Sequence, residues 1–417
     1  MSALTGIKVV EFAQGVPGPL AALRMGDLGA TVIKVEDQHG DWLRNAAPTL
    51  PDSAMSAAFF ELNRGKRALA LGGAPQQATR LLQDLLATAD VFITDRSNAE
   101  LEAPGLGAAN TAPYAPNPKL IVVSITPWGE HGPWQNRKGA ELAVQAMAGY
   151  TRYLGTRDAP ACRLGADVAC AGTGIFAGQA ILAALFARRR ANGGTGQRIS
   201  LSLLNSLLSL KSIHLAAQSD PDRYAGPRVG GANYPPERGW KTGQGNIFFA
   251  FGGSVGAQGR PGWVKFMEEA GFTRLLQDER FDPIGRTTTG YGSRVQELRA
   301  EYEREFARYS AVELVDMIRK HAGNGAYYQN AEEAIRHPQT TALEVVRRVP
   351  AAGGTVEVRA FPARYSRLRP EIKGHAPAHN QHGRAIAREL GLDDAAIDTL
   401  IASGALAPDR TGTEAAA

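Results

Sequence analysis

The sequence predicts an α/β fold in which helices cover a parallel sheet. Apolar runs typical of buried strands alternate with segments typical of helices along the first half of the chain. The first repeat is a strand over 7–12, a helix over 20–28 and a strand over 31–35, which together make a βαβ unit. The turn after its first strand contains glycine but lacks the spacing G-x-G-x-x-G. This absence counts against a nicotinamide dinucleotide as the ligand.

The same alternation predicts the remaining elements. Strands are expected over 68–71, 91–94 and 120–125, and helices over 76–87, 141–150 and 168–186. The first domain is expected to span 1–218, and 219–242, rich in Pro, Gly and charge, is expected to be a linker and active-site loop. A small domain is expected over 243–325, with a strand over 246–251 and helices over 263–269, 294–308 and 311–321. A strand over 355–360 and a helix from residue 385 follow.

Composition narrows the class of protein. A chain of 417 residues favours two domains. The net charge of +5 is spread along the chain, and the tightest basic group, Arg188 to Arg190, is typical of a solvated helix end rather than a nucleic-acid site. The two cysteines, Cys162 and Cys170, fit no metal spacing and favour a reducing cytoplasm. We expect no signal peptide and no apolar run long enough to span a membrane.

One carboxylate stands out in the stretch RLGADVACAGTGIFAGQAILAAL, which spans 163–185. Asp167 directly precedes a run of small and apolar residues that predicts a tightly packed helix. The unpaired N–H groups at a helix N-terminus favour a carboxylate there and keep it ionised. Asp167 is therefore either a simple N-cap or a carboxylate nucleophile.

This stretch resembles the signature of class III CoA-transferases, the CaiB/BaiF family. The resemblance continues through Arg188-Arg189-Arg190 to the turn Gly194-Thr195-Gly196-Gln197, which a second helix follows in the family. Five further segments match the family in the same order: LTGIKVVEFAQGVPGPLAALRMGDLGATVIKVED, FFELNRGKRALAL, ADVFITD, NPKLIVVSITPWGEHGPW and GAELAVQAMAGY. The resemblance implies a Rossmann-like large domain built from both termini, a smaller α/β domain and two interlocked chains in a homodimer. The segment 326–417 would then be a return linker and the C-terminal part of the large domain.

The resemblance also implies the chemistry. Class III enzymes move CoA between an acyl-CoA donor and a carboxylic acid acceptor. Asp167 lies at the family's nucleophile position, where aspartyl anhydride and aspartyl-CoA thioester intermediates form. Glu141 matches an acidic residue of the active site, and Gly230 and Gly231 are the nearest match to a glycine loop that stabilises the oxyanion. The CoA thioester is a substrate, so no tightly bound cofactor is expected, and no metal, nucleic acid or membrane partner.

The expected CoA contacts are carried over position by position. Gln14, Gly15 and Val16 match first-turn residues that line CoA, and Lys138 matches a lysine near the pantetheine. Asn63, Lys66 and Arg67 lie in a matching segment and are candidates to meet phosphates, although exposed surface charge explains them almost as well.

The chain departs from the family at two of these places. Asp37 stands where formyl-CoA transferase has an arginine, and Asp95-Arg96-Ser97 replaces the usual Asn, aromatic and basic residues. Arg96 is the best substitute for the lost positive charge. These departures argue against formyl-CoA and oxalate as the substrates.

Three alternatives remain at this point. An acyl-CoA racemase of the same family needs a His-Asp pair, but the matching place reads Lys138-Gly139-Ala140-Glu141-Leu142. A weakly catalytic partner subunit of a heteromeric transferase is favoured by the altered CoA contacts and disfavoured by the presence of Asp167. A nicotinamide oxidoreductase is disfavoured by the missing glycine fingerprint.

Overall fold

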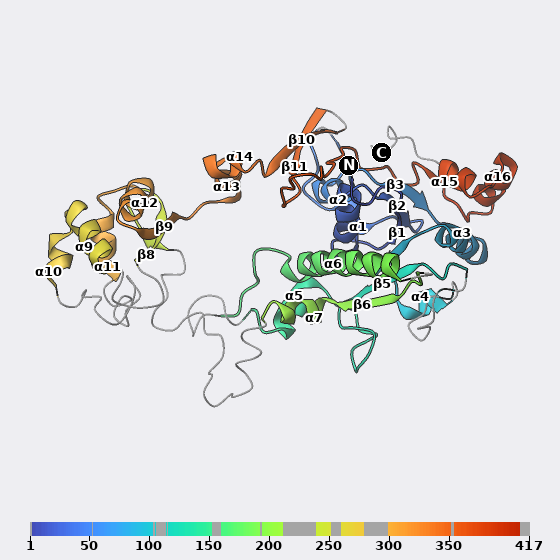
Figure 1. Cartoon of the computed structure of the whole chain (residues 1–417), viewed down its shortest axis with the longest axis horizontal. Coiled ribbons are helices and arrows are strands. Elements are labelled where there is room, and N and C mark those ends of the chain that lie inside the picture. The colour runs from blue at the N-terminus through green and yellow to red at the C-terminus, as the bar shows by residue number, and fades with distance from the viewer. Residues whose placement is uncertain are drawn as a thin grey trace. The chain divides into compact units, whose positions relative to one another are not determined.

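The structure is a computed structural model. It describes residues 2–51, 53–102, 105, 114, 116–151, 160–191, 194–211, 239–251, 260–278, 299–351 and 354–408. The chain forms two compact units (Figure 1). The larger unit combines Met1–Ala148, Leu164–Ser212 and Thr341–Ala417, and the smaller unit combines Gly149–Arg163 and Ile213–Thr340.

Six parallel strands form the central sheet of the larger unit, in the order β3-β2-β1-β4-β5-β6. This is the strand order of doubly wound dinucleotide-binding folds, so the predicted α/β class is confirmed. The strands are β1 (Lys8–Phe12), β2 (Thr31–Glu36), β3 (Arg67–Ala70), β4 (Val91–Thr94), β5 (Ile121–Thr126) and β6 (Arg198–Ser202).

Helices cover both faces of this sheet, because successive strand residues point to opposite sides. Val9, Val91 and Val123 pack with α1 (Pro17–Asp27) and α6 (Val168–Arg190). Val10 and Phe92 point the other way and pack with α3 (Pro75–Ala87) and with the C-terminal α15 (Gly383–Glu389) and α16 (Asp394–Ala402). Both ends of the chain therefore contribute to one core, as Figure 1 shows.

Shorter elements complete the larger unit. α5 and α7 pack against α6, and the antiparallel hairpin β10–β11 packs against Leu50 and Phe60. These elements are η1 (Trp42–Asn45), α2 (Ala57–Asn63), α4 (Asn98–Glu102), α5 (Glu141–Met147), α7 (Leu203–Ser209), β10 (Val346–Ala351) and β11 (Gly354–Arg359).

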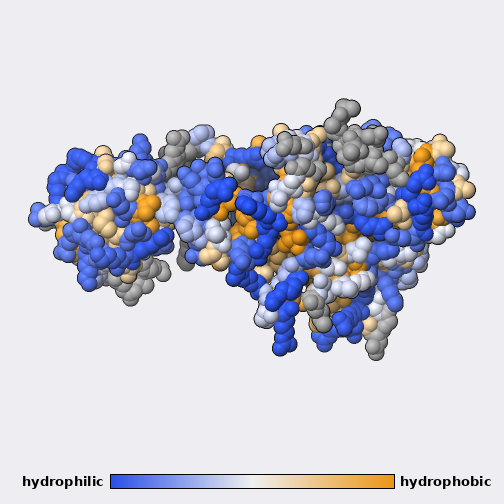
Figure 2. Space-filling view, turned by 90° about the horizontal axis from the view of Figure 1, so that it is seen from above, coloured by the Kyte–Doolittle hydropathy of each residue, from blue (hydrophilic) through white to orange (hydrophobic). Residues whose placement is uncertain are grey.

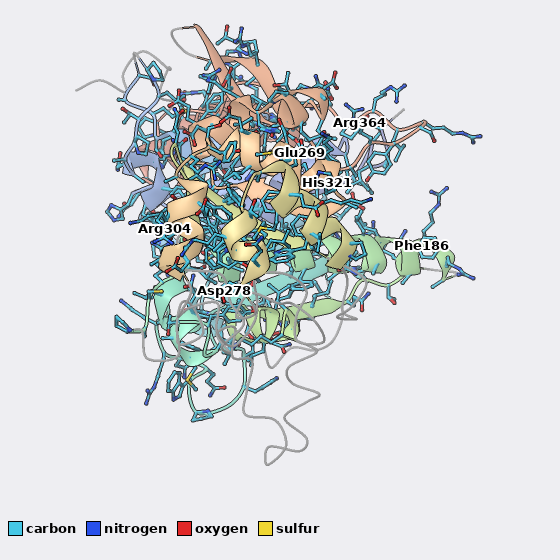
Figure 3. The ribbon with its side chains drawn as sticks, turned by 90° about the vertical axis from the view of Figure 1, so that its left-hand side faces the viewer. Phe186, Glu269, Asp278, Arg304, His321 and Arg364 are labelled. Carbon is cyan, nitrogen blue, oxygen red and sulfur yellow. The ribbon has the colours of Figure 1, made fainter. Side chains whose placement is uncertain are left out.

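The smaller unit has an aromatic core under a mostly hydrophilic surface (Figure 2). Its antiparallel sheet, β7-β8-β9, packs Phe249 and Phe251 against Trp263, Phe266 and Phe306. Figure 3 shows Glu269 beside His321 at the edge of this core, with the Glu269 Oε2 atom 2.5 Å from the His321 Nε2 atom. The elements are β7 (Trp240–Lys241), β8 (Asn246–Phe251), α9 (Arg260–Glu269), α10 (Thr273–Gln277), α11 (Arg299–Phe306), α12 (Ala311–Lys320), β9 (Gly323–Tyr327) and α13 (Ala331–Arg336), with α14 (Pro338–Ala342) at the boundary between the units.

Two predictions need correction. The sequence after the turn at 194–197 predicted only a helix, whereas residues 198–202 form the edge strand β6 before α7 begins. The prediction that no apolar run is long enough to span a membrane is wrong. Among the described helices, α6, with 23 residues, is long enough and apolar enough to cross one. In this fold α6 packs against α1, β5 and β6, which is the contact that its small residues permit.

Candidate active site

Asp167 is the N-cap of α6, yet its carboxylate makes no hydrogen bond to the N-terminus of that helix. Glu141, the first residue of α5, occupies this position instead. Its carboxylate accepts hydrogen bonds from the backbone N–H groups of Ala169 (2.9 Å) and Cys170 (2.8 Å). The capping function is therefore performed by Glu141, and the exposed Asp167 side chain is not committed to it.

Gln145 holds Glu141 in this position. The Gln145 side-chain amide donates to Glu141 Oε1 at 2.8 Å, and its carbonyl oxygen accepts from the Leu164 N–H group at 3.0 Å. Burial raises the pKa of Glu141, but the hydrogen bonds from Gln145, Ala169 and Cys170 outweigh it and hold the pKa below its usual range. Gln145 was missed by sequence reasoning, although its i, i+4 spacing from Glu141 places both on one face of α5.

α6 is in close contact with α1, the helix that follows the turn after β1. A Cβ atom on Gly174 would lie 2.8 Å from the Pro17 carbonyl oxygen and 3.0 Å from the Leu20 Cβ atom. Only glycine allows α1 and α6 to approach this closely. The small-residue pattern after Asp167 therefore positions the Asp167 helix against the helix that begins at the Gln14–Pro19 turn.

The backbone N–H groups of that first turn are occupied by carboxylates. Gln14 N–H donates to Asp95 Oδ2 at 2.9 Å, and Gly15 N–H donates to Asp41 Oδ1 at 3.1 Å. Gly15 has a φ of +68° and lies against the Trp42 ring, where a Cβ atom would be 2.9 Å from the nearest ring carbon. Val16 is the N-cap of α1 and supplies no side-chain hydrogen bond. These two N–H groups are therefore occupied, and a contact of this turn with CoA would have to come from its other atoms.

Buried charges underlie the same turn. Lys34 Nζ lies 2.9 Å from Glu11 Oε1 and 2.9 Å from Asp41 Oδ2, and Lys66 Nζ lies 2.5 Å from Glu11 Oε2. All four side chains are buried, and burial lowers the pKa of Lys66 to about 8. Lys66 therefore supports the turn from inside the protein. Sequence reasoning did not identify Glu11 or Lys34, whose only signal is a charged residue within an apolar strand.

Arg96 lies beside the turn among acidic side chains. Its guanidinium stacks on the Phe12 ring, with 4.3 Å from the Cζ atom to the ring centre. Its Nη1 atom lies 3.5 Å from Asp37 Oδ2.

The structure does not bring every predicted residue to this place. Lys138 is exposed in the loop after β5, where its carbonyl oxygen accepts a hydrogen bond from the Trp128 indole. Arg67 lies at the amino end of β3 and forms two 2.8 Å bonds with Glu389. Asn63 is buried, and its side-chain oxygen accepts from Lys66. Gly230 and Gly231 lie outside the described residues. Within the described ranges, no group of three His, Cys, Asp or Glu side chains could hold a metal ion.

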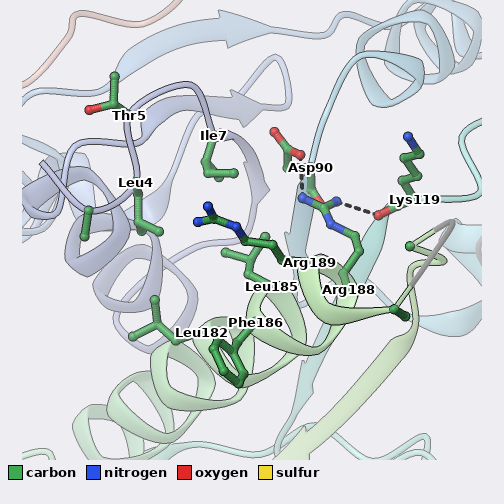
Figure 4. Close-up of a pocket in the computed structure, with 13 residues that line it drawn as sticks. Leu4, Thr5, Ile7, Asp90, Lys119, Leu182, Leu185, Phe186, Arg188 and Arg189 are labelled. Atoms are coloured by element: carbon green, nitrogen blue, oxygen red, sulfur yellow. Dashed lines mark hydrogen bonds and ion pairs between the residues drawn. The ribbon is translucent and has the colours of Figure 1, made fainter.

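A cavity of about 700 Å³ lies at the opposite end of α6 (Figure 4). Apolar side chains, including Leu4, Leu182 and Phe186, line it together with Arg188 and Arg189. Arg188 is paired with Asp90 at 2.6 Å, so the guanidinium of Arg189 is the more available of the two. The cavity lies at the amino ends of the strands, because Ile7, Asp90 and Lys119 line it just before β1, β4 and β5. The first turn follows β1 and lies at the carboxyl ends, and α6 begins after Asp167 on that side. None of the predicted site residues lines this cavity.

Comparisons with known proteins agree with this fold. The family model of CoA-transferase family III matches residues 4–383. Succinate–glutarate CoA-transferase of Agrobacterium fabrum is 31% identical over 391 residues, covering 89% of this chain and 93% of that protein. A probable fatty acyl-CoA transferase of Mycobacterium tuberculosis is 28% identical over 392 residues, covering 91% and 96%.

A solved structure shows the same similarity. The CaiB/BaiF family protein from Brucella suis has a TM-score of 0.80 and 27% sequence identity, covering 93% of this chain and 99% of that one. The match of the family model extends over nearly the whole chain. The protein therefore belongs to CoA-transferase family III, and it is an enzyme that transfers CoA.

Proposed function

We propose that the enzyme moves CoA from an acyl-CoA donor to a carboxylic acid acceptor through covalent intermediates on Asp167. One observation carries this proposal. Glu141 fulfils the capping role at α6, so the exposed Asp167 carboxylate stands at a helix N-terminus without being committed to the helix. A carboxylate oxygen can hold an acyl group and then CoA in turn, as this exchange needs.

The proposed reaction has four steps. A carboxylate oxygen of Asp167 attacks the thioester carbonyl, the C–S bond breaks, and CoA leaves as a thiolate from a mixed anhydride. The thiolate attacks the Asp167 carbonyl carbon, which releases the donor acid and leaves an aspartyl-CoA thioester. The acceptor carboxylate attacks this thioester, giving a second anhydride and CoA thiolate. The thiolate then attacks the acceptor's carbonyl carbon, which yields the new acyl-CoA and restores Asp167.

Each tetrahedral intermediate carries an oxyanion that needs hydrogen-bond donors. We propose that the backbone N–H groups of Gly230 and Gly231 supply them, as the family resemblance suggests. Glu141 then acts by holding the N-terminus of α6 and not by transferring a proton.

Trapping the covalent intermediate tests the proposal. The enzyme would be incubated with acetyl-CoA, succinyl-CoA or a medium-chain acyl-CoA and no acceptor, then digested for peptide mass spectrometry. A hydroxylamine-sensitive acyl or CoA adduct is expected on Asp167, with Asp167→Ala as the negative control and Cys170→Ala as the positive one. An adduct on Cys162 or Cys170, or efficient transfer without any adduct, would contradict the proposal.

The acids exchanged are a separate proposal. The compared relatives are named for succinate and glutarate and for fatty acyl groups. We propose an organic acid of one of these two classes as the acceptor. Rates of CoA exchange across short dicarboxylic and longer monocarboxylic acids would decide between them.

We also propose that two copies of the chain form an interlocked homodimer. α13 and α14 contain no buried residue, and Ile335, Leu343 and Val345 nearby are about half exposed (45%, 54% and 43%). Isolated helices this short are not stable in water without tertiary packing. These helices therefore need a partner surface, and a second copy supplies one in the proposed assembly.

An exposed apolar stripe on α6 supports the same proposal. Ile175, Leu182 and Phe186 are spaced to share one face of the helix and are 54%, 39% and 62% exposed. Figure 3 shows Phe186 at the outer end of this helix. Light scattering over a dilution series should show the dimer mass throughout. An active monomer at low concentration would contradict the interlocked assembly.

A further inference from the structure

The strand order indicates where a nucleotide would meet the sheet. In open parallel sheets, ligands bind beyond the carboxyl ends of the strands, at the point where the strand order reverses. Here that point lies between β1 and β4, because the order runs β3-β2-β1-β4-β5-β6. We call the space beyond these two strands the strand-end region; the Gln14–Gly15 turn follows β1 there, and Asp95 and Arg96 follow β4.

The backbone N–H groups of the first turn cannot bind a phosphate here as they do in dinucleotide-binding folds. In those folds the N–H groups of the first turn and the next helix face the pyrophosphate. In this chain the Gln14 and Gly15 N–H groups already donate to Asp95 and Asp41. An incoming phosphate would meet carboxylates there, so the attraction must come from a cationic side chain.

Arg96 is a cation of this strand-end region, and three carboxylates surround it without binding it tightly. Its Nη1 atom is 3.5 Å from Asp37 Oδ2 and 3.6 Å from Glu100 Oε1, and its Nε atom is 3.9 Å from Asp95 Oδ1. A charge-assisted hydrogen bond is about 2.7–2.9 Å long, so none of these is at full strength. The Nε atom is buried and has no hydrogen-bond partner among the described residues.

Asp37 is the carboxylate nearest to Arg96, and an asparagine there would keep its main backbone contact. It follows β2 and reaches Arg96 across the end of β1, and its side chain is 35% exposed. It also accepts from the His39 N–H group at 2.9 Å, a bond that an asparagine oxygen would keep. Phe12 holds the guanidinium plane from below and would remain in place.

We propose that Arg96 binds a phosphate of CoA and that Asp37 is its built-in competitor, so that acyl-CoA must displace Asp37 from Arg96 to bind. The inference rests on the proposed function. It makes Asp37 a residue that weakens binding of the nucleotide end of CoA. A larger share of the binding free energy then comes from the acyl group, which is the part that differs between acyl-CoA thioesters.

Isothermal titration calorimetry with CoA, dephospho-CoA and pantetheine tests the proposal. Asp37→Asn should tighten CoA binding by about two- to fivefold, the range that a partly exposed ion pair supports. Arg96→Gln should weaken it about tenfold or more, because a charge-assisted contact is lost. In the double variant Asp37→Asn adds no gain, because the two residues act on one contact. Pantetheine, which has no phosphate, should bind all variants equally.

Several outcomes would overturn the proposal. These are an unchanged CoA affinity in Asp37→Asn, the same gain in the Arg96→Gln background, or a gain with pantetheine. A gain with CoA alone would assign the contact to the 3′-phosphate, and an equal gain with dephospho-CoA would assign it to the pyrophosphate. Asp84→Asn, on the exposed side of α3, removes the same charge away from the strand-end region and should leave the CoA affinity unchanged. The wild-type enzyme can form the covalent adduct on Asp167 while Asp37→Asn binds CoA with unchanged affinity. In that case the proposal for Arg96 and Asp37 fails and the proposed function stands.

Discussion

Two aspartates occupy the same position at the start of a helix but have different surroundings. Asp393, the N-cap of α16, accepts a 2.8 Å hydrogen bond from the Ala396 N–H group. Asp167, the N-cap of α6, makes no such bond, because Glu141 takes the N–H groups there. The two side chains therefore form a matched pair, one that caps its helix and one that does not.

This contrast yields a prediction. Asp167→Ala should reduce CoA transfer about a thousandfold or more, as removal of a covalent nucleophile does. Its free energy of unfolding should stay within about 0.5 kcal/mol of wild type, since no capping bond is lost. Asp393→Ala should cost about 1 kcal/mol and keep its activity. Urea denaturation and steady-state assays on both variants check this, and the opposite pattern would return Asp167 to a capping role.

A second residue-scale prediction concerns Asp95. Burial raises the pKa of Asp95 to about 6, and the Gln14 N–H group and Arg96 only partly offset it. Between its ordinary pKa of about 4 and pH 6, the folded protein holds a proton that the unfolded chain has lost. Ionised Asp95 therefore lowers stability as the pH rises through 6.

Asp95→Asn removes this effect and keeps the acceptor for Gln14. The variant should melt at a higher temperature than wild type at pH 7.5, and the difference should shrink towards pH 5. Differential scanning calorimetry at the two pH values measures it. A difference that grows towards pH 5 would contradict the assignment.

Positions were predictable where the pattern is local, and contacts that depend on packing were not. The sequence placed Asp167 directly before a small-residue helix, and α6 begins at the next residue. Glu141 was expected in the active site, but its partners Ala169 and Cys170 lie 28 and 29 residues away, so no pattern indicated that it caps α6. From the sequence, Lys66 was a candidate to meet phosphates or an exposed surface charge, because nothing local shows that Glu11 on another strand pairs with it.

At the scale of elements, periodicity identified the central strands and most helices. β4 matches its predicted range, and β1 and β5 differ from theirs by one residue. β6 was missed because its alternating residues, RISLS, run without a break into the leucine-rich α7. An edge strand has hydrogen-bonded neighbours on one side only, and its sequence is correspondingly less apolar.

α6 provides a prediction at this scale. Phe186→Glu should weaken self-association, because it places a charge in the exposed apolar stripe that we propose is covered by a second copy. Val312→Glu, at a residue of α12 that is 52% exposed, adds the same charge outside the stripe and serves as the matched control. Sedimentation velocity should show a larger monomer fraction for the first variant only. Equal dimerisation of both would exclude the stripe from the interface.

At the scale of the whole molecule, the sequence predicted two compact parts but could not derive how the chain divides between them. The larger unit takes three separate stretches, and the return of the chain after residue 340 follows from contacts such as the Leu71–Leu406 bridge. Only the family resemblance suggested that return. The proposed interlocking of two chains would leave no periodic signal, because it depends on which copy supplies each surface.

The contribution of α15 and α16 to the sheet has a consequence for how the protein is made. Ile386, Ala387 and Ile397 cover the same face of the sheet as Val10 and Phe92. A ribosome that has finished β6 must still synthesise about 180 residues before α15 emerges, which takes roughly ten to forty seconds at ~5–20 residues per second. During that interval α3 covers this face of the sheet without α15 and α16, so part of its apolar surface stays exposed. We therefore expect that nascent chains on the same messenger RNA can aggregate through this face, and that chaperones which shield it until translation ends raise the yield.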